Sequence, residues 1–239
     1  MSGHSKWATT KRAKAVTDAA RSRIFTKLTK LITVAARHGG GDPTSNVQLR
    51  FAVDKARAAN VPRDNIERAI KRGTGELGGA VLEEFTYEAV GPSGTALVIE
   101  GVTDSKNRTH SELRNLLEQH GGKLAEPGSQ RWQFSHVGLF TVPVPAGKTS
   151  DDVELAAADA GADDTQVGEE GVEVVTPPDA AARVRTAMSE AGFAASPPGF
   201  RFIPKNVVEL EAGAAATARG LVEALLDHDD VQAVAANFV

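Results

Sequence analysis

The amino-acid sequence predicts an α+β protein: an N-terminal basic helical bundle followed by two α/β domains, the second of them ferredoxin-like and inserted into the first. Three observations predict this architecture. Apolar residues recur at helical spacing in the first third of the chain, strand-like and helical segments alternate after it, and the net charge changes sign between these parts. The predicted domains are residues 1–78, residues 79–134 plus 205–239, and the inserted residues 135–204.

The first domain is predicted to contain three helices. Phe25, Leu28 and Ile32 fall on one side of a helix over residues 18–38, because positions three and four apart share a helix face. The run Gly39-Gly40-Gly41 is expected to end this helix.

Two prolines mark the next two helices. Asp42-Pro43 is expected to begin the second helix, with Asp42 as its N-cap. Pro62 is expected to begin the third, which Gly73 ends. The glycine-rich residues 73–79 are typical of a hinge between domains.

The second domain is predicted to begin with a hairpin of two strands over residues 84–103. In the helix that follows, Thr109 and Glu112 have the spacing of a capping box. Trp132 and Phe134 are two residues apart, so we expect them to share one face of a strand.

The rest of the chain predicts the insertion and the return to the second domain. Residues 138–203 follow the order β-α-β-β-α-β of a ferredoxin-like unit, with helices capped by Ser150 and begun by Pro177-Pro178. The final pieces are too small for a core of their own, and we expect them to complete the sheet of the second domain. They are a strand at 207–210, a helix at 214–228 and a strand at 231–238.

Charge is distributed unevenly along the chain. Residues 1–78 contain 16 Lys and Arg against 6 Asp and Glu, a net charge of +10, whereas the remaining residues carry −14. A basic module joined to an acidic body suggests a polyanion as partner, DNA or ribosomal RNA. The alternative is that the two parts of the chain attract each other. The acidic domains could also contact a basic surface of the ribosome or of RNA polymerase.

Three groups of basic residues are the candidate nucleic-acid contacts. The first is a stripe on the helix over 18–38, opposite its apolar side, and the second belongs to the third helix. The third is an N-terminal arm around a tryptophan that could stack on a base or pack on the bundle. In that order the residues are Arg23, Lys27, Lys30 and Arg37; Arg63, Arg68, Lys71 and Arg72; and Lys6, Trp7, Lys11, Arg12 and Lys14. Reversing Lys27 and Lys30 to Glu is expected to weaken binding without unfolding the chain.

Little in the sequence predicts catalysis. There are 0 cysteines, which excludes disulfides and thiolate sites. The histidines lack the spacing of a helical metal pair and no nucleotide fingerprint is found, so we expect no enzyme activity, metal or cofactor. Asp227 to Asp230 are interpreted as a solvated turn. Asp104, Asn107 and Arg108 form a polar loop that could bind a ligand or only cap a helix.

The ends and hydropathy of the chain bear on its location. No apolar run approaches the length of a membrane span, and the N-terminal residues lack the apolar core of a signal peptide. A cytoplasmic location without membrane contact is therefore expected.

Several blocks of sequence, in the same order along the chain, resemble the YebC/PmpR family, which includes a mitochondrial relative, the translational activator of cytochrome c oxidase. The blocks are Gly3-His4-Ser5-Lys6-Trp7, Gly39-Gly40-Gly41-Asp42-Pro43, Asn65-Ile66-Glu67-Arg68-Ala69-Ile70-Lys71-Arg72-Gly73, Asn107-Arg108-Thr109, Glu126-Pro127-Gly128-Ser129 with Trp132, and Leu225-Leu226-Asp227-His228-Asp229-Asp230. Thr9-Thr10-Lys11-Arg12, Ala125 and Arg131 depart from the usual family pattern.

The resemblance implies the same three-domain arrangement and a non-enzymatic, nucleic-acid-binding regulatory protein. The function it implies first is that of a DNA-binding transcriptional regulator. The alternative is a ribosome-associated translation factor that contacts ribosomal RNA and relieves stalling at proline-rich stretches.

Overall fold

A computed structural model describes the backbone of residues 4–196 and 198–239, and the side chains of these ranges from residue 20 onward. The chain divides into two compact units. Unit 1 comprises Met1–Tyr87, Ile99–Leu124 and Ala216–Val234, and unit 2 comprises Glu88–Val98, Ala125–Ala215 and Ala235–Val239. The structure is α+β, as predicted, whereas the boundaries of three domains stay a prediction.

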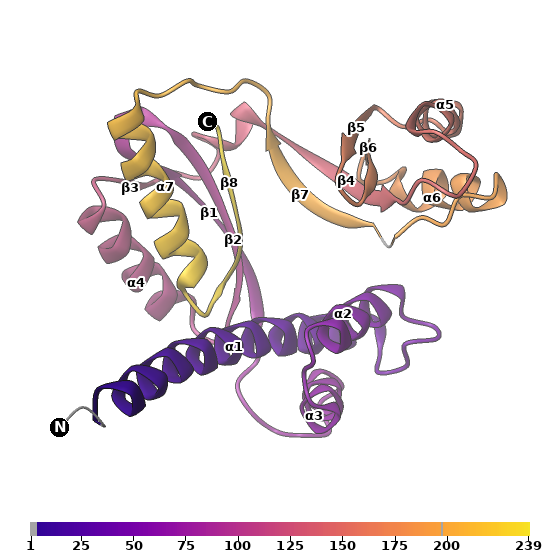
Figure 1. Cartoon of the computed structure of the whole chain (residues 1–239). Helices are drawn as coiled ribbons and strands as arrows, with labels where there is room; N and C mark the ends of the chain where they lie inside the picture. Colours follow the sequence, from indigo (N-terminus) through magenta and orange to yellow (C-terminus); the bar gives the residue numbers. More distant parts are fainter. Residues whose placement is uncertain (1–3, 197) are drawn as a thin grey trace. The chain divides into compact units, whose positions relative to one another are not determined.

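Three helices form the N-terminal part of unit 1: α1 (His4–Gly39), α2 (Val47–Ala58) and α3 (Arg63–Gly73) (Figure 1). Helix α1 ends at the predicted glycines but begins well before residue 18. Ile32, Leu49 and Ala56 are fully buried where the three helices meet. This core follows the predicted apolar positions, because α1 contributes Leu28, Ile32 and Ala35 from one face.

The second helix begins later than predicted. Its N-cap is Asn46, and Asp42 forms a turn in which its carboxylate accepts the Thr44 N–H at 2.9 Å. The buried Asn46 side chain accepts the Leu49 N–H at 3.0 Å and donates to the carbonyls of Ala35 and Gly40, each at 2.8 Å. The prediction of Asp42 as cap was wrong because Asn46 satisfies the end of α1 and the start of α2 together.

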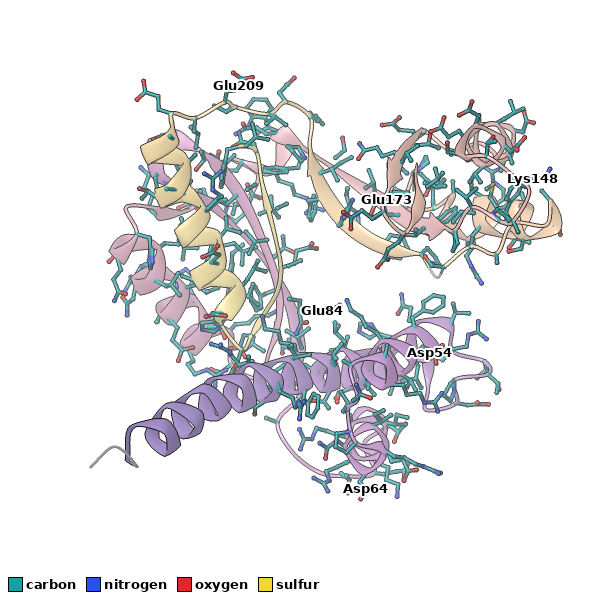
Figure 2. All side chains as sticks on the ribbon, in the orientation of Figure 1. Asp54, Asp64, Glu84, Lys148, Glu173 and Glu209 are labelled. Carbon is teal, nitrogen blue, oxygen red and sulfur yellow. The ribbon has the colours of Figure 1, made fainter. Side chains whose placement is uncertain are left out.

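Helix α3 packs closely on α1 through its last residue. A Cβ at Gly73 would lie 2.4 Å from the Thr33 carbonyl oxygen, so only glycine permits this approach. Thr33 also donates its hydroxyl to the Ala69 carbonyl at 3.1 Å. At the other end, Asp64 lies in the first turn, where a carboxylate complements the helix dipole (Figure 2).

The first sheet has the strand order β3-β1-β2-β8, from Lys123–Ala125, Glu83–Val90, Ala96–Thr103 and Val231–Ala236. In unit 1, helices α4 (Lys106–Gln119) and α7 (Ala212–Asp227) lie on one face of it (Figure 1). The N-cap of α4 is Ser105 and not the predicted Thr109, which is a buried residue inside the helix.

Two further predictions for this sheet were wrong. In the described part of the chain, residues 207–210 form no strand, and Val208 makes only an isolated bridge to Phe238. Trp132 lies in a 3-10 turn (Arg131–Gln133) before the strand that begins at Phe134, so the two rings do not share a strand face.

The second sheet, within unit 2, has the order β5-β6-β4-β7 with antiparallel neighbours. Its elements are β4 (Phe134–Val142), α5 (Ser150–Ala160), β5 (Asp164–Gly168), β6 (Gly171–Thr176), α6 (Ala181–Glu190) and β7 (Gly199–Pro204). This succession confirms the β-α-β-β-α-β order. Phe140, Val174 and Met188 are buried between the sheet and its helices.

The cap of α5 is Thr149, one residue before the predicted Ser150, and it forms a capping box with Asp152. Helix α6 begins at Ala181, a turn after the two prolines. In the described residues, none of the helices is both long enough and apolar enough to span a bilayer.

Candidate nucleic-acid interface

A cleft of about 400 Å³ lies between α1 and α3 in unit 1. Helix α3 has its apolar residues Ile66 and Ala69 against the bundle core. The same periodicity places Arg68 and Arg72, one helical turn apart, at the opening of the cleft. Lys30 lines it from α1. The cleft therefore presents three cationic side chains.

Polar uncharged groups complete the lining of this cleft. Thr26 and Thr29 contribute hydroxyls from α1, where they donate to the carbonyls of Ser22 and Thr26 at 3.0 and 2.9 Å. Asn65 contributes an amide from α3. Asp104 is the acidic residue of the lining. This set of groups suits an anion that carries several oxygen acceptors.

The predicted residues of α3 are all exposed. Arg63 forms an ion pair with Glu67 at 2.7 Å, one turn along the same helix. Because both side chains are largely solvated, this pair holds Arg63 only weakly. Lys71 and Arg72 lie in the last turn, where the helix dipole favours positive charge.

The predicted stripe on α1 faces another part of unit 1. Arg23 pairs with Asp227 at 3.2 Å, and the Lys27 ammonium donates to the Leu226 carbonyl. Further along, Arg37 donates to the Leu82 carbonyl at 3.0 Å. These contacts favour the alternative that parts of the chain attract each other, at least for α1.

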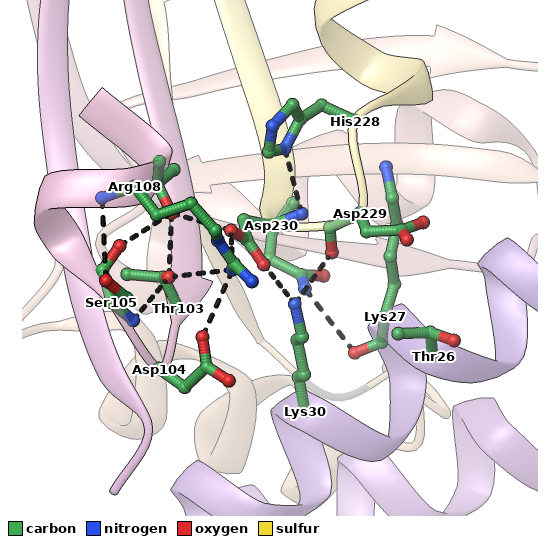
Figure 3. A network of polar contacts seen from close by, with 12 residues as sticks. Thr26, Lys27, Lys30, Thr103, Asp104, Ser105, Arg108, His228, Asp229 and Asp230 are labelled. Atoms are coloured by element: carbon green, nitrogen blue, oxygen red, sulfur yellow. Dashed lines mark hydrogen bonds and ion pairs between the residues drawn. The ribbon is translucent and has the colours of Figure 1, made fainter. Parts of the chain in front are cut away.

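Lys30 makes the most deeply buried contact of the stripe. Its ammonium binds Oδ1 of Asp230 and donates to the Asp229 carbonyl at 3.1 Å (Figure 3). The Asp230 side chain is only 2% exposed. Reversal of Lys30 to Glu would set two carboxylates against each other there, so the expectation that both lysines could be reversed without unfolding the chain does not fit this geometry.

Asp230 is held from a second side by α4. Its Oδ2 accepts from Nη2 of Arg108 at 2.7 Å and from the Thr109 hydroxyl at 2.6 Å (Figure 3). Thr109 is 2.7 Å from the hydroxyl of Thr103, at the end of β2. The interpretation of residues 227–230 as a solvated turn was therefore wrong for Asp230, which joins α1, β2, α4 and the turn before β8.

The network determines the charge state of this carboxyl group. Burial alone would raise the pKa of Asp230, but the hydrogen bonds from Lys30 and Thr109, the charge of Lys30 and the hydrogen bond from Arg108 lower it to about 2. Asp230 is therefore ionised at neutral pH. For Lys27, burial lowers the pKa, and the nearby charges of Asp227 and Asp229 oppose that change.

Among the described residues, Glu112, His228 and Asp230 could together hold a metal ion, because their possible ligand atoms lie within 4.8 Å of one another. His228 Nδ1 accepts the Asp230 N–H at 3.1 Å, so the proton of a neutral ring is on Nε2, which faces Glu112 at 3.1 Å. A metal ion would require that nitrogen unprotonated and would compete with Lys30 and Arg108 for Asp230. The geometry favours an ion-pair network at this position.

The predicted arm, Lys6, Trp7, Lys11, Arg12 and Lys14, lies outside the described side chains. Sequence reasoning missed Asp227 and Asp230 as partners of the stripe. Their signal was present: acidic residues cluster at 227–230, and positive charges recur at positions 23, 27 and 30. The sequence indicated the polar loop at Asp104 to Arg108, but it did not indicate the residue that this loop contacts.

Comparison with known proteins identifies the relatives of this fold. Residues 5–76 match the model of the TACO1/YebC protein N-terminal domain, and residues 82–238 match that of the TACO1/YebC second and third domain. A probable transcriptional regulatory protein from Pelotomaculum thermopropionicum is 48% identical over 239 residues, which cover all of this chain and 98% of the relative. One from Dictyoglomus turgidum is 44% identical, covering all of this chain and 96% of the relative.

A solved structure agrees with these matches. The crystal structure of a conserved hypothetical protein from Aquifex aeolicus is 37% identical in sequence, with a TM-score of 0.81 over 93% of this chain and 91% of that one. Since the family models together span nearly the whole sequence and the relatives match it end to end, the resemblance found in the sequence is confirmed: the chain belongs to the TACO1/YebC family.

Proposed function

We propose that this protein is a non-catalytic, DNA-binding regulator of transcription that contacts the phosphate backbone through the cleft between α1 and α3. The relatives named probable transcriptional regulatory proteins support the regulatory role. A cytoplasmic location is part of this proposal, since the relatives are proteins of bacteria, whose DNA lies in the cytoplasm.

The observation that carries the proposal is the pair Arg68 and Arg72. Both are exposed, they lie on one face of α3, and they open onto the same cleft. A guanidinium group binds phosphate oxygens through two parallel N–H bonds and stays charged at any physiological pH. Lys71 adds a third exposed cation between them in sequence.

The stripe on α1 has a smaller part in this proposal than the sequence suggested. Arg23 and Lys30 have carboxylate partners, so a phosphate would have to displace Asp227 or Asp230 to reach them. The proposal therefore places the phosphate contacts on Arg68, Lys71 and Arg72. Arg63 and Arg37 are not among the residues that line the cleft, and each has a contact inside the chain, with Glu67 and with the Leu82 carbonyl.

A ribosome-associated role is the second candidate. One observation favours it: the side chains that α3 adds to the cleft, Asn65, Arg68, Ala69 and Arg72, line one side of a hollow whose other side is α1. A recognition helix, by contrast, has to enter a groove of the duplex. Structured RNA is recognised largely through backbone and shape, which such a hollow could serve. The acidic residues of unit 2 would then face a basic protein surface of the ribosome, or of RNA polymerase in the first candidate.

Charge reversal at the cleft tests the proposal. We expect Arg68→Glu/Arg72→Glu to weaken binding of duplex DNA by about tenfold or more and to lower the salt slope by about 0.9 for each phosphate that the variant no longer neutralises. The matched control is Lys55→Glu/Arg57→Glu, which reverses two exposed charges of α2 outside this cleft. Circular dichroism checks that all variants are folded. Equal affinity of the cleft variant and the control would refute the assignment.

Crosslinking in growing cells separates the two candidates. Ultraviolet crosslinking followed by sequencing of attached DNA and RNA is expected to recover a few promoter regions, and recovery to fall for Arg68→Glu/Arg72→Glu. Reads concentrated in ribosomal RNA, with promoters at background, would replace the first candidate with the second.

A further inference from the structure

A buried carboxylate in unit 2 holds the loop before β4 in one conformation. Glu88 accepts the backbone N–H groups of Gly128 and Gln130, each at 2.6 Å, and of Arg131 at 2.9 Å. Burial would raise the pKa of Glu88, but these three hydrogen bonds and the Arg131 charge keep it below the usual value. Three charge-assisted hydrogen bonds at its base restrain this loop before any partner arrives.

This loop carries a tryptophan whose ring is open to solvent. Trp132 is 67% exposed, although a large aromatic side chain is ordinarily among the more buried types. Its indole N–H donates to the Ser129 carbonyl at 2.9 Å. Because the polar group of the ring is satisfied within the loop, the exposed part that remains for a partner is its π surface.

A line of planar groups continues from the loop onto β4 and β7. The Arg131 guanidinium lies 4.9 Å from the centre of the Phe202 ring, and that ring lies 4.8 Å from His136. The His136 ring is in turn 6.2 Å from that of Phe200. The pairing of His136 with Phe202 and of Gly138 with Phe200 across β4 and β7 explains this succession.

The exposed members of this line are Arg131, His136 and Phe200, with Phe202 buried beneath them. Phe200 is 46% exposed on β7, which is an edge strand of its sheet. Trp132 follows Arg131 directly in the chain, and we name these four exposed residues the aromatic platform: Arg131, Trp132, His136 and Phe200.

The charge around the platform differs from that of the rest of unit 2. Residues 125–215 contain six Lys and Arg against fourteen Asp and Glu. Three of the six, Arg131, Arg201 and Lys205, lie on the loop, on β7 or directly after it. Arg201 pairs with Glu173 at 3.2 Å, and the Lys205 backbone N–H donates to the Gln133 carbonyl at 2.9 Å. Arg201 alternates with Phe200 and Phe202 along β7 and therefore points to the opposite face of the sheet. The positive charge on the side of the exposed rings is that of Arg131.

We propose that the aromatic platform binds unpaired bases of a single-stranded nucleic acid. Stacking needs flat, exposed rings held in place, and the Glu88-bound loop and the β4–β7 pairing supply them. Arg131 can stack on a base and also meet a phosphate, and Lys205, directly after β7, adds a second positive charge. This inference extends the proposed function, because it adds a site for unpaired strands in unit 2 that is separate from the backbone-binding cleft in unit 1.

The experiment compares single-stranded and duplex probes on the full chain. Fluorescence anisotropy is measured with labelled oligothymidine, oligouridine and a DNA duplex, each at the same salt concentration. The variants are Trp132→Ala and Phe200→Ala, singly and together. The matched controls are Leu155→Ala and Val167→Ala, which remove exposed apolar side chains of the same unit, 65% and 63% exposed.

Removal of each ring is expected to weaken single-strand binding by about tenfold, because this is the loss of affinity expected when one base no longer stacks on an aromatic side chain. The controls and the duplex affinities are expected to change by less than about twofold. A larger decrease for oligouridine than for oligothymidine, or the reverse, would identify RNA or DNA as the strand that is preferred.

Two outcomes would overturn the inference. One is single-strand affinity in the ring variants equal to that of the controls, which would assign the exposed rings and the free edge of β7 to another partner, such as an extended peptide. The other is an equal decrease for duplex and single strand. Failure of the proposed function has a different signature, because Arg68→Glu/Arg72→Glu would then leave duplex binding unchanged whatever the ring variants do.

Discussion

Replacing Asp230 by Asn tests whether the ion-pair network stabilises unit 1. The change keeps the shape of the side chain but leaves Lys30 without its carboxylate partner. Arg108 loses one of three carboxylates, since it also pairs with Asp104 at 3.1 Å and with Glu112 at 3.7 Å. The lowering of the Asp230 pKa from 3.8 to about 2 corresponds to at most about 2.4 kcal/mol at 1.36 kcal/mol per pKa unit. Solvent screening through Arg108, which is 48% exposed, reduces this contribution to about 1–2 kcal/mol.

Removal of one partner adds the cost of the charges left behind. Breaking a fully buried pair costs about 3–5 kcal/mol, and Arg108 can turn to solvent, so we expect Asp230→Asn to lower the free energy of unfolding by about 2–3 kcal/mol. Urea unfolding followed by circular dichroism at neutral pH measures this difference. Asp227→Asn is the control, since its side chain is 68% exposed beside Arg23 and its replacement should cost about 0.5 kcal/mol or less.

The pH dependence gives a second test of the same reasoning. The folded-state pKa lies below the unfolded one, so the contribution of Asp230 is complete above about pH 5 and is lost as the pH falls toward about 2. The difference in the free energy of unfolding between the wild-type chain and Asp230→Asn should therefore disappear across that pH window. Equal stability of the two proteins at neutral pH, or a gap that does not change on acidification, would refute the assignment.

Two further substitutions probe close packing and the loop before β4. Gly73→Ala would place a methyl group 2.4 Å from the Thr33 carbonyl oxygen, and we expect a decrease of about 1–3 kcal/mol in the free energy of unfolding, measured with heat or urea. The control is Gly78→Ala, whose methyl group would meet nothing within 4 Å. An unchanged stability of Gly73→Ala would contradict the close approach. Glu88→Gln removes the carboxylate that accepts three backbone N–H groups, so hydrogen exchange of the Gly128 and Arg131 amides should accelerate by about tenfold or more. Exchange at the wild-type rate would show that the loop does not depend on this carboxylate.

The helical bundle and the ferredoxin-like unit could be predicted because their signals are local. Phe25, Leu28 and Ile32 lie within two turns of one helix, and the second sheet is built from consecutive segments. The errors occurred where one residue forms hydrogen bonds with the ends of two elements. Asn46 caps α2 and also closes α1, and a search for a cap just before a proline finds Asp42 first.

The candidate site was harder to predict because its charges are neutralised by residues far away in sequence. Lys30 and Asp230 are 200 positions apart, and the spacing of basic residues on a helix is the same whether it faces phosphate or carboxylate. The burial of Asp230 could not be predicted either, since Asp227 and Asp229 belong to the same turn and are not buried. The aromatic platform was missed for a related reason, because β4 and β7 bring His136 and Phe200 together across more than sixty residues.

The pairing on α1 changes what the charge of the N-terminal part means for function. The +10 of residues 1–78 overstates what a nucleic acid would meet, because Arg23 and Lys30 already have carboxylate partners. A phosphate that displaced Asp230 from Lys30 would leave that buried carboxylate with Arg108 as its only remaining charged partner among the described residues, which is costly. Binding is therefore easiest at Arg68, Lys71 and Arg72, for which the described side chains include no carboxylate partner that must be removed. It follows that the salt slope of duplex binding should reflect the few cations of α3 and not the total charge of the bundle.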